Sequence, residues 1–246
     1  MNCRLIAHGL PYSFFLHSSA RMTGLDERRR PKGLGRTLLL CLASCAGAPP
    51  LAASSTLSGI APDHLHPPQY ASAVAAYRGA CDDGSAQACS YLGFMYDNAF
   101  GVRRDIQQAV SLSERGCAEG GAYGCAYLGY LFQTGRGVAA DAARAAKLFR
   151  KACDGADSSG CLLLGIMYKT GAGVPQDAEY AVQLFGTACD DGETLACVSL
   201  GYMYANGEGV DRDRPRAQEL FQSACARSDE IGCQAARQLE RRLPVP

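Results

Sequence analysis

Apolar and glycine positions repeat with a fixed period of 36 residues along most of this chain. A leucine, the glycine that follows it and an alanine further on recur in four copies without an insertion. The repeated positions are Leu92, Leu128, Leu164 and Leu200; Gly93, Gly129, Gly165 and Gly201; and Ala109, Ala145, Ala181 and Ala217. Such self-similarity predicts a solenoid of stacked units, because a single unit cannot bury its apolar face alone.

The residue pattern within each unit predicts two helices joined by a glycine-rich turn. The first helix is expected over Ser85–Asp97, with equivalents at 121–133, 157–169 and 193–205. Glycines in the turn permit the positive φ angles of a tight connection. Asp105 and its equivalents are suited to cap the second helix. That helix carries Ala109 and Leu112 at the spacing of a buried stripe, and Gly93 beside Ala109 favours close approach of the two helices.

The two ends of the repeat array differ from its middle. Pro67 and Pro68 precede a helix expected over Tyr70–Ala80, which would be the lone second helix of an incomplete first unit. After Cys233 the last unit becomes polar, as expected of a terminal capping helix. The predicted repeat domain therefore covers residues 69–246.

Ten cysteines follow the same period. Cys81, Cys117, Cys153, Cys189 and Cys225 lie 36 residues apart, and each is followed after eight residues by Cys89, Cys125, Cys161, Cys197 or Cys233. The resulting pattern, C-x7-C-x2-LG-x2-Y-x2-G-x-GV-x2-D, resembles the Sel-1-like repeat family, which is related to the tetratricopeptide repeats. Because each unit carries the cysteine pair, the chain resembles most the cysteine-rich bacterial branch of this family, which is named for the Helicobacter cysteine-rich proteins. Phe132, Ala99, Ala156 and Ser228 depart from the pattern.

This resemblance implies an all-α, right-handed superhelical solenoid of antiparallel helix pairs linked by disulfides. Each cysteine pair would connect the end of one unit's second helix to the opening turns of the next helix. Closing a loop of about nine residues contributes roughly 2–3 kcal/mol in the chain-entropy model. Zinc binding is the alternative, although the spacing differs from the usual C-x2-4-C knuckle and the repeats contain no histidine. We expect no metal and no cofactor.

The first 45 residues have the features of an export signal. A basic segment between Arg28 and Arg36 precedes an apolar run, Thr37–Ser44, that is too short to span a bilayer but fits a secretory signal peptide. The run ends in Leu42-Ala43-Ser44-Cys45, which resembles a bacterial lipobox and predicts lipidation of Cys45. Cleavage after Ala48 and an organelle presequence are the alternatives.

Two further predictions concern this region. Met22 is a better initiator than Met1, because the basic segment would then lie near the start, and residues 1–21 would not be translated. Residues 46–68 are rich in Ala, Pro and Ser and are expected to form a flexible linker. His64 and His66 within it are interpreted as solvated linker residues.

Charge is unevenly distributed although the net charge is zero. Residues 1–45 contain seven of the 24 Lys and Arg but two of the 24 Asp and Glu, which leaves 17 against 22 for the remainder. A mildly acidic solenoid without a basic stripe offers no surface for nucleic acid.

Catalytic chemistry has little support in the repeats. All four histidines precede them, so no Ser/His/Asp or Cys/His constellation forms there. The resemblance implies penicillin binding and weak β-lactamase activity as an alternative function. Lys169-Thr170-Gly171 matches a β-lactamase motif and Tyr96-Asp97-Asn98 loosely matches another, but both fall at the helix end and turn of the repeat. The enzyme class therefore stays open.

The variable face of the first helices is the candidate binding surface. It is unusually apolar for a solvated face and would line the concave side of the superhelix. Its residues are Phe94, Tyr123, Tyr130, Leu162, Ile166, Val198 and Tyr202. The alternative is that these side chains form ordinary packing between repeats.

We therefore predict an extracytoplasmic, lipid-anchored or secreted scaffold that binds a protein or peptide partner in its concave groove. It would be a monomer in the bacterial cell envelope, attached to the membrane only through its lipid. An assembly factor for a respiratory complex, suggested by mitochondrial relatives of the repeat family, is disfavoured by the lipobox.

Overall fold

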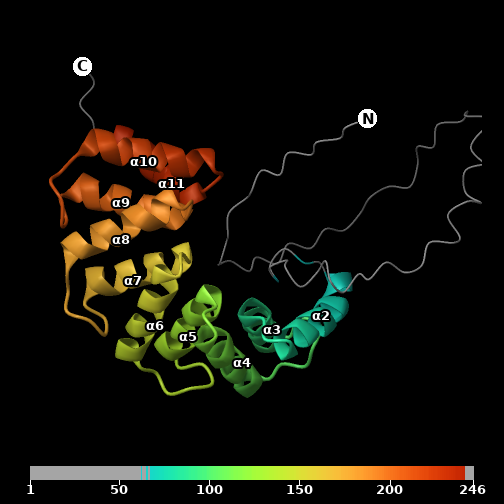
Figure 1. Ribbon diagram of the computed structural model, residues 1–246. Helices are drawn as coiled ribbons and strands as arrows, with labels where there is room; N and C mark the ends of the chain where they lie inside the picture. The colour runs from blue at the N-terminus through green and yellow to red at the C-terminus, as the bar shows by residue number, and fades with distance from the viewer. Residues whose placement is uncertain (1–61, 63–64, 66, 242–246) are drawn as a thin grey trace, which may run out of the picture.

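A computed structural model describes residues 62, 65 and 67–241 of the chain, and these residues form an open arc of helices running from α2 to α11 (Figure 1). A short 3-10 turn, Pro67–Gln69, leads into the first helix. The helices are α2 (Tyr70–Asp82), α3 (Ala86–Asn98), α4 (Ile106–Ala118), α5 (Ala122–Thr134), α6 (Ala142–Asp154), α7 (Ser158–Thr170), α8 (Ala178–Asp190), α9 (Thr194–Asn206), α10 (Arg214–Ala226) and α11 (Glu230–Glu240). No strand occurs in the described part of the chain. The all-α solenoid of helix pairs predicted from the period is confirmed.

Helix boundaries follow the capping residues of the repeat. α3, α5, α7, α9 and α11 are the first helices of their units, and α2, α4, α6, α8 and α10 are the second helices. Each second helix from α4 to α10 begins after an aspartate whose carboxylate accepts a backbone N–H, for example Arg144 N–H to Asp141 at 2.8 Å and Tyr180 N–H to Asp177 at 2.9 Å. The predicted N-caps are therefore confirmed, because an oxygen acceptor satisfies an N–H that the helix leaves unpaired.

The glycines of the turn let successive units approach closely. Gly173 has φ +72°, and a Cβ placed on it would lie 2.4 Å from the carbonyl carbon of Ala142, at the start of α6. Gly209 meets Ala178 of α8 in the same way, at 2.4 Å. Within a unit, a Cβ on Gly93 would lie 3.0 Å from the carbonyl oxygen of Ala109. The close helix approach expected at this glycine is thus present.

Five disulfides connect each second helix to the next first helix. They are Cys81–Cys89, Cys117–Cys125, Cys153–Cys161, Cys189–Cys197 and Cys225–Cys233. Pairing of all ten sulfurs removes them as zinc ligands. The same junctions carry basic side chains, since Arg115 donates to the carbonyl of Cys81 at 2.7 Å and Lys151 to that of Cys117 at 2.6 Å.

The first helices lie on the inner side of the arc. α3 packs on α5, α5 on α7 and α9 on α11, whereas no two second helices share contacts as extensive. The second helices instead contribute the large core side chains Phe149, Phe185 and Phe221, which are fully buried against the first helices. An arc closes toward the side on which neighbouring helices are nearest, so the exposed surface of the first helices is concave.

Two residues of the segment that precedes α2 are buried. Pro62 and Leu65 are buried, and Leu65 packs with Ala73, Val74 and Tyr77 of α2. α2 has no preceding first helix, and Leu65 packs on its apolar face instead. The signal region, Met22 and Cys45 lie outside the described residues.

Candidate binding face on the first helices

The seven residues predicted to line the concave groove differ in their exposure. Ile166 and Tyr202 are each 37% exposed, whereas Phe94, Leu162 and Val198 are 5%, 7% and 5% exposed. Tyr123 and Tyr130 are half-buried. The structure therefore divides the set between the two interpretations, with buried members in the packing between repeats and exposed members on the surface.

At the repeat position shared by Phe94, Tyr130, Ile166 and Tyr202, exposure is greater where one residue of the following unit is small. Phe94 is covered by Tyr127, whose ring centroid lies 5.4 Å away in an edge-on contact. The positions equivalent to Tyr127 in later units are Leu163, Ser199 and Ala235, which become progressively smaller. Ser199 and Ala235 are too short to cover Ile166 and Tyr202, the equivalents of Phe94.

Ile231 of α11 is a member of this face that the sequence prediction missed. It is 51% exposed, and the described residues contain no other exposed large hydrophobic side chain besides Ile166 and Tyr202. All three lie on first helices. Ile231 occupies the same repeat position as Tyr123, and this equivalence could have identified it from the sequence. The last unit is otherwise polar, so it was interpreted as a capping helix without a binding surface.

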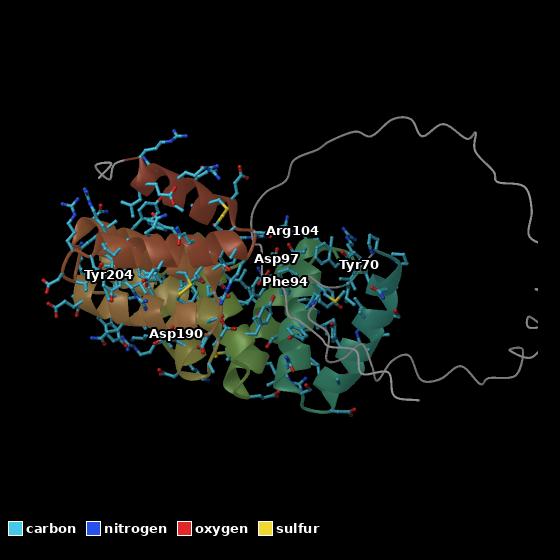
Figure 2. All side chains as sticks on the ribbon, turned by 90° about the horizontal axis from the view of Figure 1, so that it is seen from above. Tyr70, Phe94, Asp97, Arg104, Asp190 and Tyr204 are labelled. Atoms are coloured by element: carbon cyan, nitrogen blue, oxygen red, sulfur yellow. A yellow bond between two sulfur atoms is a disulfide. The ribbon has the colours of Figure 1, made fainter. Side chains whose placement is uncertain are left out.

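A buried carboxylate lies at the N-terminal end of this face. Figure 2 shows Phe94, Asp97 and Arg104 close together. The Asp97 side chain is fully buried and accepts hydrogen bonds from Tyr127 Oη at 2.6 Å, Arg136 Nη2 at 2.7 Å and Arg104 Nη2 at 3.3 Å. Burial raises the pKa of the Tyr127 hydroxyl, and its hydrogen bond to Asp97 raises it further. Tyr127 therefore acts as a donor, and the three donors compensate the buried charge.

The same pair of repeat positions carries the reversed charges two units later. Lys169 Nζ lies 3.4 Å from Glu208 Oε2, and the spacing along the chain equals that between Asp97 and Arg136. Both side chains of this second pair are about a third exposed. These pairs link a first helix to the turn of the following unit, so they serve the stacking of units.

The residues of the two β-lactamase-like motifs have structural partners. Thr170 Oγ1 donates to the carbonyl of Ile166 at 2.8 Å, Lys169 pairs with Glu208, and Gly171 ends α7 with φ +74°. Tyr96 accepts from Arg78 at 3.0 Å, and Asn98 donates to the carbonyl of Phe94 at 2.9 Å. Each side chain serves a helix end or a helix contact, and none of these groups is aligned as a nucleophile with a base.

An arginine and two aromatic positions form a second surface cluster, on the sides of the units. Arg150 donates to the hydroxyls of Tyr180 and Tyr168. One unit earlier the corresponding positions are Glu114, Phe132 and Arg144, and the Arg144 guanidinium lies 4.1 Å from the Phe132 ring centroid. The hollow beside Phe132 and Arg144 is shallow and open, and two of its charged side chains, Arg144 and Glu114, pair at 3.7 Å.

Three acidic N-caps border the concave face. Asp157, Glu193 and Asp229 precede α7, α9 and α11, and each accepts a backbone N–H of its own helix. Glu193 also accepts from Ser159 Oγ of the neighbouring first helix at 3.3 Å. Burial raises the pKa of Glu193, against the lowering effect of these hydrogen bonds, and the nearby charges of Asp157 and Asp229 raise it further. Burial also raises the pKa of Asp157.

Neither a metal cluster nor a membrane span is found in the described part of the chain. No group of three or more His, Cys, Asp or Glu is placed to hold a metal ion there. None of its helices is both long and apolar enough to cross a bilayer.

The helix pairs, the concave first-helix face and the repeating junctions together define a protein of the helical-repeat solenoid class. The Sel1 repeat family model matches residues 86–121, 122–157, 158–193 and 194–229. The chain belongs to the Sel1 repeat family. No curated protein sequence matches it at a significant level.

Several solved structures are similar to this chain. A Sel1 repeat protein from Oxalobacter formigenes is 29% identical with a TM-score of 0.63, over 69% of this chain and 50% of that one. The protective antigen c5321 of uropathogenic Escherichia coli is 29% identical with a TM-score of 0.61, over 66% of this chain and 35% of that one. This chain thus spans between a third and a half of their lengths. Cysteine-rich protein B of Helicobacter pylori is 30% identical with a TM-score of 0.41, over 49% of this chain and 92% of that one.

Proposed function

We propose that this protein is a non-catalytic scaffold that binds a protein or peptide partner on the concave face of its first helices. The observation that carries the proposal is the location of Ile166, Tyr202 and Ile231, the exposed large hydrophobic residues of the described chain, on that one face. Exposed apolar side chains gathered on one surface are typical of interaction sites. Aromatic anchors such as Tyr202 contribute strongly to the free energy of binding.

Export from the cytoplasm is the second part of the proposal. Five disulfides indicate an oxidising compartment, because cytosolic thiols are kept reduced. We further propose that Cys45 carries a lipid and that residues 46–61 form the tether. Mass spectrometry of the N-terminal peptide from exported protein tests this, and an unmodified Cys45 in the mature chain would exclude the anchor.

The binding experiment uses peptides selected from a random displayed library on the oxidised protein. Their affinities are then measured for the double variant Ile166→Asp and Tyr202→Asp. A matched control is Gln183→Asp with Thr187→Asp, two exposed positions on the second helix α8. We expect about a tenfold or larger loss of affinity for the first variant, since loss of a binding anchor costs more than about 1.4 kcal/mol, and no loss for the control.

Two results would contradict this proposal. Selected peptides that bind the concave-face variant as tightly as the unchanged protein would place the binding surface elsewhere. Covalent chemistry would be revealed by intact-mass measurement with and without penicillin, in which a stoichiometric penicilloyl adduct contradicts a non-catalytic scaffold.

A further inference from the structure

The three acidic N-caps begin the helices that carry the three exposed apolar residues. Asp157, Glu193 and Asp229 each lie two residues before the position held by Ser159, Leu195 and Ile231. Residues seven apart share one face of a helix, so Ile166 and Tyr202 lie on the faces that Ser159 and Leu195 begin. The hydrogen bond from Ser159 to Glu193 confirms that the carboxylate reaches this face from the neighbouring unit. We call Asp157, Glu193 and Asp229 the acidic edge.

Among the described residues, no Lys or Arg forms an ion pair with any of these three carboxylates. Arg227, which lies in the turn beside Asp229, directs its guanidinium to the carbonyl of Gly192 at 2.9 Å. Each carboxylate bonds to its own helix N-terminus, and this offsets a part of the charge.

Further acidic residues surround the edge. Asp190 ends α8, Asp191 follows it, and Glu230 begins α11. The mutual repulsion that contributes to the raised pKa of Glu193 is in keeping with this excess. At the opposite end of these first helices, Lys169 forms an ion pair with Glu208. The exposed apolar residues of α7, α9 and α11 are therefore flanked by negative charge on one side.

We propose that this surface, formed by the acidic edge together with Ile166, Tyr202 and Ile231, binds a cationic segment of a protein partner that also carries apolar side chains. The inference rests on the proposed function of the first-helix face and specifies the partner's chemistry. The negative potential of the acidic edge would attract Lys or Arg of the partner, while the partner's apolar side chains cover the three exposed residues. An anionic segment would be repelled, since like charges at an interface oppose binding.

The test neutralises the acidic edge without removing the caps. The triple variant Asp157→Asn, Glu193→Gln and Asp229→Asn keeps an acceptor oxygen at every position, and asparagine caps helices as well as aspartate. The control triple variant, Asp105→Asn, Asp141→Asn and Asp177→Asn, changes the same number of N-caps at the opposite ends of the units. Both triples alter the net charge equally, so only the position of the lost charge differs.

The probes are short fluorescent peptides of alternating Lys and Leu, Glu and Leu, or Lys and Ser. We expect the Lys–Leu peptide to bind and the other two to bind at least about tenfold more weakly. Neutralising the acidic edge should weaken Lys–Leu binding about tenfold, since three negative charges near the apolar residues are lost, while the control triple should change it less than about twofold. Addition of 1 M salt should weaken binding of the Lys–Leu peptide to the unchanged protein, because the Debye screening length falls to about 3 Å.

Several outcomes would overturn the inference. If the Glu–Leu peptide binds as tightly as the Lys–Leu peptide, charge does not contribute to recognition. If the Lys–Ser peptide binds as tightly as the Lys–Leu peptide, the exposed apolar residues do not contribute. An equal loss in both triple variants would show attraction to net charge alone. If library-selected peptides depend on Ile166 and Tyr202 but the Lys–Leu peptide does not bind, the inference fails and the proposed function stands. If neither depends on this face, both fail.

Discussion

At the scale of single residues, the N-cap position shows how one repeat position serves different purposes. The first helices begin after Ser85, Gly121, Asp157, Glu193 and Asp229. Gly121 offers no side-chain acceptor, and the Glu193 bond to Leu195 N–H is long at 3.4 Å. Glu193 is 8% exposed, so its charge is largely removed from water. At this position the cost of burial outweighs the benefit of capping.

Replacement of Glu193 by Gln should therefore stabilise the protein at neutral pH. Burial raises the pKa of Glu193 above its ordinary value of 4.5, so the folded state holds this proton more tightly than the unfolded state. Ionisation lowers stability by an amount that is absent below about pH 4.5 and grows as pH rises through the folded-state pKa. Urea denaturation across this range should show Glu193→Gln more stable than the unchanged protein at pH 7, with the difference vanishing at pH 4. A less stable variant at pH 7 would contradict this account.

At the scale of elements, the contact between a turn and the second helix of the preceding unit is set by glycine. Gly101, Gly137, Gly173 and Gly209 all have positive φ angles, and a Cβ on any of them would lie within 2.6 Å of that helix. Glycine is required here both for the left-handed conformation and for the space. Gly186, inside α8, has a different role, since a Cβ there would meet nothing within 4 Å.

Alanine substitutions at Gly173 and at Gly186 should have opposite effects on stability. Gly173→Ala should destabilise by about 2 kcal/mol or more, from the left-handed backbone and from the contact with Ala142. Gly186→Ala should stabilise by about 0.5–1 kcal/mol, because alanine favours an unstrained helix interior. Thermal unfolding of the two variants compares them directly. Equal effects would mean that the turn can shift to accommodate a side chain.

At the scale of the whole molecule, stability is a sum of units and of the junctions between neighbours. The Asp97–Arg136 and Lys169–Glu208 pairs occupy the same repeat positions but differ in burial, with the Asp97 side chain fully buried and Lys169 about a third exposed. Breaking a buried pair leaves an uncompensated charge, whereas an exposed pair contributes little.

Alanine substitution of one partner in each pair tests this difference. Asp97→Ala should cost about 3 kcal/mol, because two arginines and Tyr127 lose their acceptor, and Lys169→Ala should cost less than about 1 kcal/mol. Hydrogen exchange should show faster opening of α2 to α5 in the Asp97 variant, with α8 to α11 unchanged. Uniform acceleration along the chain would mean that the solenoid opens as one unit.

The period, the helix pairs, the aspartate caps and the position of the cysteine pairs could all be predicted from the amino-acid sequence. These features depend on residues within one unit or its immediate neighbour, so a repeated pattern such as Leu92-Gly93 or Asp105 is sufficient to predict them. The described helices begin and end within about one residue of the spans expected for the first helices.

The tertiary structure decided which parts of the variable face are surface. Phe94 and Ile166 occupy the same repeat position, but Phe94 is covered by Tyr127 of the following unit, whereas the residue equivalent to Tyr127 in the unit after Ile166 is the smaller Ser199. Burial of Leu65 against α2 and the grouping of Arg104, Tyr127 and Arg136 around Asp97 likewise depend on how units stack. The exposed fraction of a side chain depends on the neighbouring side chains that pack on it. The position of a residue within its own repeat does not specify which side chains those are.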